Sequence, residues 1–331
     1  MRFVISLLCF LTLLSVAEAQ NGYMGGIGAG ETAGIISGGS GFGIASGAVA
    51  AAPAPTFTGP GDIATGALGF WSCGRAYNAA YAAAQSPLCT VVDTTTGLAS
   101  CTFNVGTNGF ANLTALVCVG NTVSVTTFCT VTHVGCSVSE MYDQSGNANN
   151  VTQATLALMP TLTLSAKNSL PCPAGTGDNA TALITSGNVS HAAPYSITAV
   201  AERTSGGLQY ITGNSSSARG ALGFTSSANT VQADNGTSRA LTAANNTFHA
   251  LLSVASGSDP LFAVDSSGNT STSSNGTVSL SSVQYFMNYN AASAAITAGY
   301  VCELGIWPSD LNSVYTSMLS NMRSNSVGWN F

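Results

Sequence analysis

The sequence has very few charged residues. Asp, Glu, Lys and Arg make up 6% of its 331 residues, against about a quarter in an average soluble protein. Seven Lys and Arg against thirteen Asp and Glu leave a formal net charge of −6. A nucleic-acid surface needs clustered cations, so nucleic acid is not an expected partner. Hydrophobic residues total 45%, an ordinary globular share that argues against a disordered polyelectrolyte.

Long apolar runs are also scarce, and the one near the start is short. Met1-Arg2 is followed by an apolar stretch, 3–16, and by the small-x-small sequence Ala17-Glu18-Ala19. Because a bilayer-spanning helix needs about 20 apolar residues, we interpret residues 1–19 as a secretory signal peptide. The sequence therefore predicts a secreted, extracellular or periplasmic protein with no membrane association after signal cleavage.

The cysteines and histidines have no metal-ligand spacing. Cys-x-x-Cys is absent and the three histidines are scattered, so neither a metal site nor a cofactor is expected. Removal of Cys9 with the signal leaves an even number of cysteines, which in an exported chain predicts disulfides with 105 possible full pairings. Proximity in the sequence alone suggests the pairs Cys73–Cys89, Cys101–Cys118 and Cys129–Cys136, which leave Cys172–Cys302.

Composition divides the rest of the chain into two parts. Residues 20–60 are rich in Gly and Ala and predict a flexible segment, whereas 61–331 predict one folded domain. A short N-terminal helix is expected around Phe70, Trp71, Tyr77 and Tyr81, ending before Pro87.

Short β-rich runs follow from Cys101 onward, separated by Gly, Asn, Ser and Pro. Several alternate apolar residues with Ser or Thr, as half-buried strands do, and they predict an all-β antiparallel sandwich. The expected strands are 113–119, 123–134, 156–164, 196–201, 248–254 and 283–288. A terminal helix is expected after Ser309, its predicted cap, with an apolar stripe from Leu311 to Met322 packed on the sandwich.

The most specific motif is the string Met141-Tyr-Asp-Gln-Ser-Gly-Asn-Ala-Asn-Asn-Val-Thr-Gln-Ala154. From the residues alone it is a strand end and a polar turn in which Asp143 and Asn147 bond nearby backbone. The string resembles a signature of the arabinofuranosidase B catalytic domains, glycoside hydrolase family 54. The Cys129/Cys136 loop, the segment 71–77 and the segment 299–310 extend the resemblance over most of residues 60–330.

The resemblance implies a concanavalin-like β-sandwich (jelly roll) that removes α-L-arabinofuranosyl groups from arabinose-containing polysaccharide with retention of configuration. Retention requires two carboxyl groups about 5–5.5 Å apart. The family's nucleophile is a Glu followed by Asn, and its best counterpart here is Asp234-Asn235, in which a shorter Asp replaces the Glu. The resemblance therefore implies Asp234 as nucleophile and Asn235 as a substrate contact.

The second family carboxylate has no counterpart in this chain. Its position falls near Tyr289-Asn290, where no acid stands, and the family's vicinal Cys-Cys is missing. Tyr289 and Asn290 are therefore predicted substrate contacts, and Glu303 is the candidate to replace the missing acid/base. The alternating strand 300–307 can direct Glu303 either into or out of a cleft.

Aromatic side chains provide candidate sugar platforms. Tyr210, Tyr285 and Tyr289 are candidates for stacking on sugar, whereas Trp71 and Trp307 are expected to be buried core anchors.

Three functions remain open. One is a retaining glycoside hydrolase, and the alternative is a catalytically inactive glycan-binding or surface adhesion module on the same sandwich. The third is a structural surface or phage-associated protein in which the sandwich is only a scaffold. The first two predict a polysaccharide or glycan partner, and no oligomeric state is predicted.

Overall fold

The computed structural model describes residues 57–114, 116–118, 121–175, 181–214, 219–235, 238–272, 279–280, 284–288 and 298–331. The predicted signal peptide, residues 20–56 of the Gly/Ala-rich segment, and the predicted substrate contacts Tyr289 and Asn290 lie outside this part of the chain. Phe57, where the description begins, is already a buried core residue.

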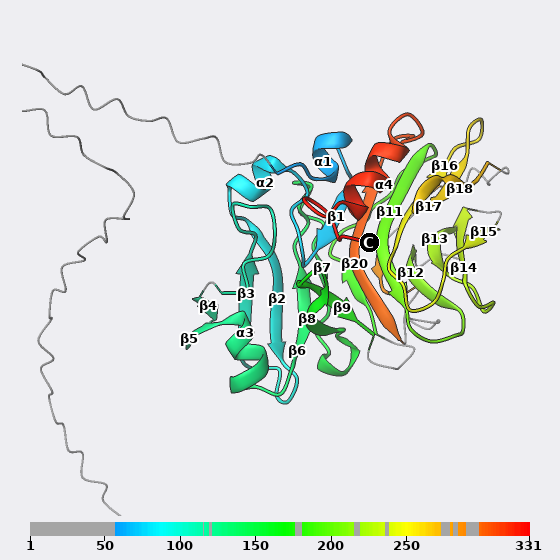
Figure 1. Ribbon diagram of the computed structural model, residues 1–331. Coiled ribbons are helices and arrows are strands. Elements are labelled where there is room, and N and C mark those ends of the chain that lie inside the picture. The colour runs from blue at the N-terminus through cyan, green and yellow to red at the C-terminus, as the bar shows by residue number, and fades with distance from the viewer. Residues whose placement is uncertain are drawn as a thin grey trace, which may run out of the picture. The chain divides into compact units, whose positions relative to one another are not determined.

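A central antiparallel sheet forms around β20 (Gly299–Trp307), the last strand of the chain (Figure 1). On one side of β20 lie β1 (Gly69–Ser72) and β9 (Leu170–Ala174). On its other side follow, in order, β11 (Tyr195–Arg203), β16 (His249–Ala255), β17 (Leu261–Val264) and β18 (Ser266–Ser271).

A second, longer antiparallel sheet packs against the central one. Its strands run in the order β5 (Asn121–Ser124), β4 (Leu116–Cys118), β3 (Ser100–Asn104), β2 (Pro87–Asp93), β6 (Cys136–Met141), β7 (Val151–Thr152), β10 (Leu183–Thr185), β19 (Gln284–Phe286), β12 (Gln209–Asn214), β13 (Arg219–Phe224), β14 (Thr230–Asn235) and β15 (Ser238–Thr242). β8 (Thr161–Lys167) pairs with both β6 and β9 and so joins the two sheets. The predicted all-β sandwich is confirmed.

The central sheet is buried on both faces, which the sequence analysis did not anticipate. On β11, Ile197 and Ala199 pack into the core between the sheets, whereas Val200 belongs to a second core beneath the C-terminal helix. All residues of β11, β16 and β17 are buried. Ser196 and Thr198 are fully buried rather than exposed to solvent. Half-buried alternation of the expected kind occurs instead in the second sheet, for example in β3.

The helices are short. The expected N-terminal helix is present around Tyr81, over Ala79–Ala83, and ends before Pro87, but two other expectations are wrong. The segment around Phe70 and Trp71 is strand β1, because these side chains face the two cores on opposite sides of the sheet. The helical elements are α1 (Pro60–Ile63), α2 (Ala79–Ala83), α3 (Val125–Thr127), a π-helical turn η1 (Phe128–Thr132), a 3₁₀ turn η2 (Leu156–Leu158) and α4 (Tyr315–Arg323). α3 and η1 replace most of the strand expected over 123–134.

The C-terminal helix packs on the outer face of the central sheet, as predicted. α4 lies against α1, β16 and β18 (Figure 1), and Met318, Leu319 and Met322 enter the second core. Its start differs from the prediction: the N-cap is Val314. Ser309 is not the cap; its carbonyl instead accepts a hydrogen bond from the Ser196 hydroxyl at 2.7 Å.

Four disulfides connect the pairs suggested by proximity: Cys73–Cys89, Cys101–Cys118, Cys129–Cys136 and Cys172–Cys302. The last spans 130 residues and ties β9 to β20.

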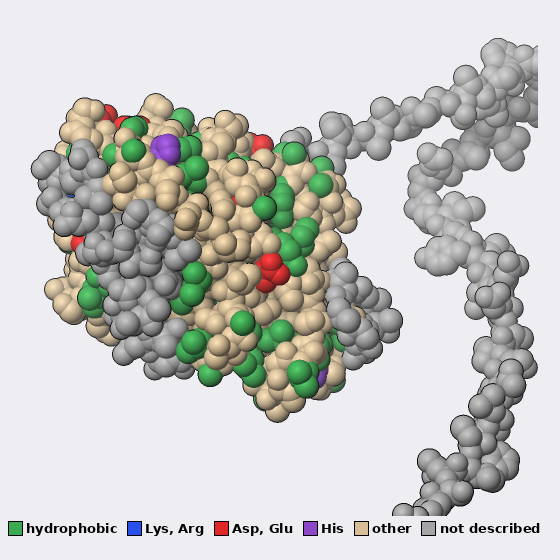
Figure 2. All heavy atoms as spheres, turned by 180° about the vertical axis from the view of Figure 1, so that it is seen from behind, with side chains coloured by type: hydrophobic (Ala, Val, Ile, Leu, Met, Phe, Trp, Pro, Cys, Tyr) green, Lys and Arg blue, Asp and Glu red, His purple; other side chains and the backbone are tan. Residues whose placement is uncertain are grey.

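Of the four arginines whose side chains the structure describes, three lie in the interior. Arg75, Arg203 and Arg239 are buried, and burial lowers the pKa of Arg239 to about 10. The Arg239 guanidinium donates to the carbonyls of Ser271, Val254 and Leu261, which fastens β15 to the central sheet. The face in Figure 2 is accordingly dominated by neutral polar and backbone atoms, with isolated acidic groups. No helix in the described ranges is long and apolar enough to cross a bilayer.

Candidate functional site

Asp143, in the family-like signature, clamps two strands together. Its Oδ1 accepts hydrogen bonds from the backbone N–H of Phe70 at 3.1 Å and of Ser145 at 2.9 Å. Its Oδ2 accepts from the N–H of Asn149 at 3.0 Å. Asp143 therefore closes its own turn and joins that turn to β1, as its predicted role in binding nearby backbone requires.

Gln144 makes a second set of contacts, with the segment that follows β1. Its Oε1 accepts from the N–H of Tyr77 at 2.7 Å, and its Nε2 donates to the carbonyls of Ser72 and Arg75. Because Gln144 is 3% exposed, its amide needs internal partners, and these three contacts supply them.

The asparagines of the signature continue this pattern. The side-chain amides of Asn147 and Asn149 donate to the carbonyls of Ala67 and Leu68 at 2.8 Å each. Asn147 thus bonds backbone carbonyls through its side chain. The indole N–H of Trp71 donates to the carbonyl of Asn149 at 2.8 Å. The signature explains how the fold is held, and none of these contacts requires a ligand.

Glu303, the predicted acid/base, has no exposed surface. Arg75 grips its carboxylate with two hydrogen bonds, Nε to Oε2 at 2.5 Å and Nη2 to Oε1 at 2.9 Å. The side chains of both residues are 0% exposed. The indole N–H of Trp329 adds a third bond, to Oε2 at 3.0 Å.

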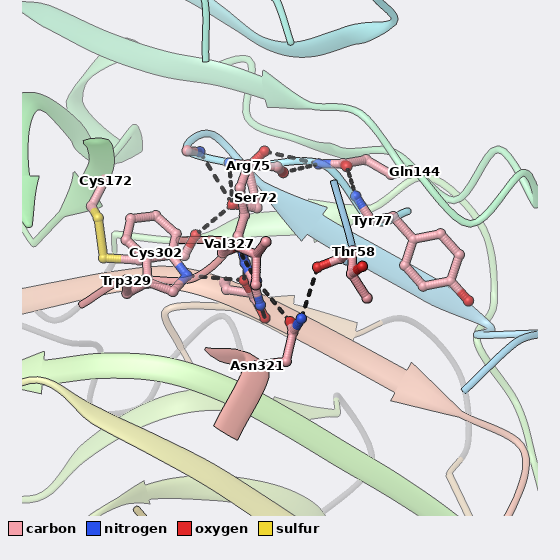
Figure 3. A network of polar contacts seen from close by, with 12 residues as sticks. Thr58, Ser72, Arg75, Tyr77, Gln144, Cys172, Cys302, Asn321, Val327 and Trp329 are labelled. Carbon is pink, nitrogen blue, oxygen red and sulfur yellow. Dashed lines mark hydrogen bonds and ion pairs between the residues drawn. A yellow bond between two sulfur atoms is a disulfide. The ribbon is translucent and has the colours of Figure 1, made fainter. Parts of the chain in front are cut away.

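Arg75 extends this network to the end of the chain. Its Nη1 donates to Asn321 Oδ1 on α4 at 2.8 Å and to the carbonyl of Val327 at 2.7 Å (Figure 3). Asn321 in turn donates to the carbonyl of Thr58 at 2.7 Å. The Glu303 carboxylate thus joins β1, β20 and both ends of the described unit.

This placement corrects the role predicted for Glu303. An acid/base must reach the glycosidic oxygen and exchange a proton with it. A carboxylate enclosed by Arg75 and Trp329 beneath the C-terminal segment cannot approach a substrate. Of the two orientations left open for the strand, Glu303 adopts the one that faces the second core.

Asp234, the predicted nucleophile, has a different environment. It is half-buried on β14 in the second sheet, opposite Ala221 on β13 and Ser238 on β15. Burial raises the pKa of Tyr195 and of Tyr210, and the nearby Asp234 carboxylate raises both further. Asp234 therefore lies within electrostatic range of the first residue of β11 and of a half-buried tyrosine on β12.

Asn235 is the last residue of β14 and pairs with Arg219. Asp234 and Asn235 are therefore the last two residues of β14. Tyr210 is the one proposed sugar platform whose side chain is described. Trp71 and Trp307 are fully buried, as expected of core anchors, and the Trp307 indole donates to the carbonyl of Ala64 at 2.9 Å.

Most other carboxylates hold the fold. Glu18, Glu31 and Asp178 lie outside the described residues. Within them, the carboxylates that bond backbone or side-chain partners of the framework are those of Asp62, Asp93, Glu140, Asp143, Asp265, Glu303 and Asp310. The other three described acids are Glu202, Asp234 and Asp259, of which Asp234 also has an interaction partner within the fold.

Glu202 and Asp259 lie at opposite ends of the central sheet, whereas Asp234 lies on β14 of the second sheet, near Tyr195. Glu202 is seven residues from Tyr195 on β11, which separates the two by about 23 Å at 3.3 Å per residue. Asp259, by contrast, is exposed in the turn after β16. Because Ala255 pairs with Tyr195, Asp259 lies at the end of the central sheet that includes Tyr195.

His249 forms a charged pair that the sequence analysis did not single out. Its Nδ1 lies 2.6 Å from Asp265 Oδ2, and its Nε2 lies 2.8 Å from the carbonyl of Ala244. Because a carboxylate oxygen and a carbonyl oxygen are both acceptors, this pair of contacts favours the imidazolium form, in which both ring nitrogens carry protons. Burial alone would lower the pKa of His249, but Asp265 and the Ala244 carbonyl raise it above its ordinary value. Sequence spacing could not have revealed this pair, since it forms across β16 and β17.

Three surface hollows lie away from Asp234. Two flank α4, with volumes of about 340 and 560 Å³, and a third of about 350 Å³ lies at the loop after β3. Neither Asp234 nor Glu303 lines any of the three. Among the described residues, no three His, Cys, Asp or Glu side chains are grouped closely enough to hold a metal ion.

No family model and no curated protein matches the sequence. Solved structures do resemble the fold. An arabinofuranosidase complexed with arabinofuranosyl-α-1,2-xylobiose superimposes with a TM-score of 0.57 at 16% identity, over 82% of this chain and 65% of that one. A glycoside hydrolase family 54 α-L-arabinofuranosidase soaked with a cyclic sulfate inhibitor gives 0.53 at 15% identity, with the same coverage. This chain spans about two thirds of their length and shares the β-sandwich fold of these glycosidases.

Proposed function

We propose that the protein binds a neutral glycan, in the class of arabinose-containing polysaccharide, through the end of the second sheet that carries Asp234. The proposal includes secretion of the mature chain. The observation that carries it is the burial of Glu303 in the Arg75 ion pair, which leaves the hydrolytic hypothesis without its second carboxylate.

The chemistry around Asp234 suits recognition of sugar hydroxyl groups. A half-buried carboxylate accepts strong hydrogen bonds from hydroxyls, and the phenol of Tyr210 offers both an apolar ring and a polar tip. Asn235 follows directly on the same strand. The fold shared with arabinofuranosidases supports arabinose-containing chains as the first ligands to examine.

Retaining hydrolysis is the second candidate. It is favoured by Asp259, an exposed carboxylate at the end of the central sheet that includes Tyr195, the β11 residue near Asp234. In this reading Asp234 is the nucleophile and Asp259 the acid/base, and the two carboxyl groups must approach to about 5–5.5 Å when substrate is bound.

Binding and hydrolysis can be separated with one set of variants. Affinity electrophoresis in arabinoxylan and in debranched arabinan compares the wild type with Asp234→Asn. Glu202→Gln is the matched control, since it makes the same carboxylate-to-amide change at the other end of β11. We expect Asp234→Asn to weaken retention at least tenfold and Glu202→Gln to leave it unchanged.

Hydrolysis of p-nitrophenyl α-L-arabinofuranoside is measured on the same proteins. The proposal predicts no turnover above the uncatalysed rate. Turnover that disappears in both Asp234→Asn and Asp259→Asn would establish the hydrolase instead. Unchanged polysaccharide retention in Asp234→Asn would remove this end of the sheet as the site.

A further inference from the structure

The hollow at the loop after β3 has a neutral polar lining. It has a volume of about 350 Å³ and lies beside the C-terminal end of α2. That volume falls in the range of small-molecule sites. Its lining includes Gln85, Thr107, Asn108, Phe110 and Asn112, and no charged residue. The lining therefore favours a neutral ligand rich in hydrogen-bonding groups.

The loop that forms the hollow is held rigidly. The N–H of Gly106 donates to the carbonyl of Phe110 at 2.7 Å, and the N–H of Gly109 donates to the carbonyl of Gly106 at 2.9 Å. Gly109 has φ +83, and a Cβ there would lie 2.0 Å from the Phe57 ring. The N–H of Ala111 donates to the carbonyl of Gly74 at 2.9 Å. The hollow is therefore formed before any ligand arrives, which lowers the entropy lost on binding.

Two asparagines present oriented donors to this hollow. Asn108 Oδ1 accepts from the N–H of Phe110 at 3.1 Å. Asn112 Oδ1 accepts from the hydroxyl of Thr114 at 2.9 Å and from its N–H at 3.3 Å. Because each carbonyl oxygen is fixed by the chain, each Nδ2 is directed by the same geometry and can donate to a ligand.

Gln85 supplies a third amide from an unusual backbone position. It follows α2 with φ 49, in the left-handed region where a helix end usually has Gly. Gln85 is exposed, and its side chain lines the hollow.

Phe110 gives the hollow an apolar surface. Its ring is half-buried and meets Phe57 edge-on, with centroids 5.8 Å apart and planes at 80°. An aromatic ring beside amide donors matches a sugar, which has an apolar C–H face and hydroxyl groups around its rim.

We propose that this hollow binds one neutral sugar unit of a polysaccharide, at a subsite separate from Asp234. The choice of ligand class rests on the proposed function; the geometry of the hollow does not. Eight strand positions separate β3 from β14 in the second sheet, about 38 Å along its curved surface at 4.8 Å per strand. A polysaccharide that reaches both places gains avidity, whereas a tetrasaccharide occupies one.

The test is a titration of ¹⁵N-labelled protein with xylotetraose, arabinotetraose and cellotetraose, followed through side-chain amide signals. Production in an oxidising bacterial cytoplasm leaves Asn112, an Asn-x-Thr acceptor, free of glycan. We expect the amide signals of Gln85, Asn108 and Asn112 to shift together with a Kd on the order of 1 mM for at least one sugar.

Asn108→Asp is the decisive variant, because Asp keeps the Oδ1 acceptor for Phe110 and replaces the donor with a charged acceptor oxygen. It should weaken binding at least fivefold, with an unchanged backbone spectrum. Asn246→Asp, the same change at an exposed turn, should have no effect. Wild-type affinity in Asn108→Asp, or no shift with any of the three sugars, overturns the proposal. Asp234→Asn should leave these shifts in place, so failure here and failure of the Asp234 site are distinguishable.

Discussion

Glu303 and Asp234 were both predicted to be catalytic carboxylates, and the structure gives them opposite environments. Glu303 lies under the C-terminal segment with no exposed surface and is bonded by Arg75 and Trp329. Asp234 is half-buried near the end of a strand in the other sheet, close enough to Tyr195 and Tyr210 to raise the pKa of both.

The difference shows what scarce charge is used for in this molecule. Separating charges from water costs several kcal/mol per ion unless they are paired and bonded. Arg75, Arg203 and Arg239 are all buried and donate to carbonyls or to a carboxylate inside the fold. The protein therefore combines a largely neutral surface with a few buried arginines that hydrogen-bond to the interior of the fold. One of these, Arg75, forms an ion pair with Glu303.

The largest expected effect concerns the disulfide beside Glu303. Replacing Cys172 and Cys302 with Ala opens a loop of 130 residues, which by loop entropy costs about 5 kcal/mol of unfolding free energy. The matched control removes Cys129–Cys136, whose loop of seven residues predicts about 2 kcal/mol. Urea unfolding of both variants measures the difference, and equal losses would contradict a framework centred on β20.

A smaller effect is expected at the signature turn. The Asp143 carboxylate accepts hydrogen bonds from the N–H groups of Phe70 and Asn149. In Asp143→Asn, an amide NH2 group would face one of these two N–H groups, and that hydrogen bond would be lost. Losing one bond to a carboxylate should cost about 2 kcal/mol. Thermal unfolding monitored by circular dichroism provides the measurement. Asp310→Asn, whose carboxylate contacts only Asn312 in its own turn, should lose less than half as much; a larger loss there would contradict the clamp.

The smallest effect is a pH dependence from His249. Because Asp265 raises the pKa of His249 in the folded state, the pair stabilises the fold fully below the unfolded pKa near 6.5. This contribution is lost as pH rises through the folded pKa. His249→Gln should flatten the stability profile above about pH 6.5, as measured by urea unfolding between pH 5 and 9. A profile that keeps its slope would exclude His249 as the source.

Glu202 titrates in a different window and serves as the internal reference for that profile. Burial raises its pKa, although Lys167 and His249 oppose the shift. A carboxyl whose folded pKa is raised loses stability as pH climbs above its unfolded value, near 4.3. Glu202→Gln should therefore alter the acidic part of the profile and, because the Glu202 carboxylate also raises the pKa of His249, change the neutral part less than His249→Gln does.

Local patterns predicted much of the fold and little of the site. Alternation and turn residues indicated a β-sandwich, and the Leu311–Met322 stripe indicated a docked helix. Proximity sufficed for the disulfides because three of the pairs close short loops.

Long-range packing decided the rest. The segment around Trp71 was predicted to be helical because Ala-rich sequence follows it. Trp71 lies instead in strand β1, where it pairs with Leu304 of β20. The orientation of Glu303 depends on its ion pair with Arg75, which is 228 residues away in the sequence. No local sequence pattern could have indicated this pairing. Asn108 and Asn112 resembled ordinary loop residues because their orientation comes from Phe110 and Thr114.

The most direct test of the contrast between the two carboxylates is equilibrium urea unfolding of Glu303→Gln and Asp234→Asn, measured side by side. Glu303→Gln leaves the Arg75 charge buried without its counter-ion and should lose about 3–5 kcal/mol. Asp234→Asn, a near-isosteric change at a half-buried position, should lose less than about 1 kcal/mol. Equal losses, or a Glu303→Gln variant as stable as the wild type, would contradict the assignment of Glu303 to the framework and Asp234 to the ligand site.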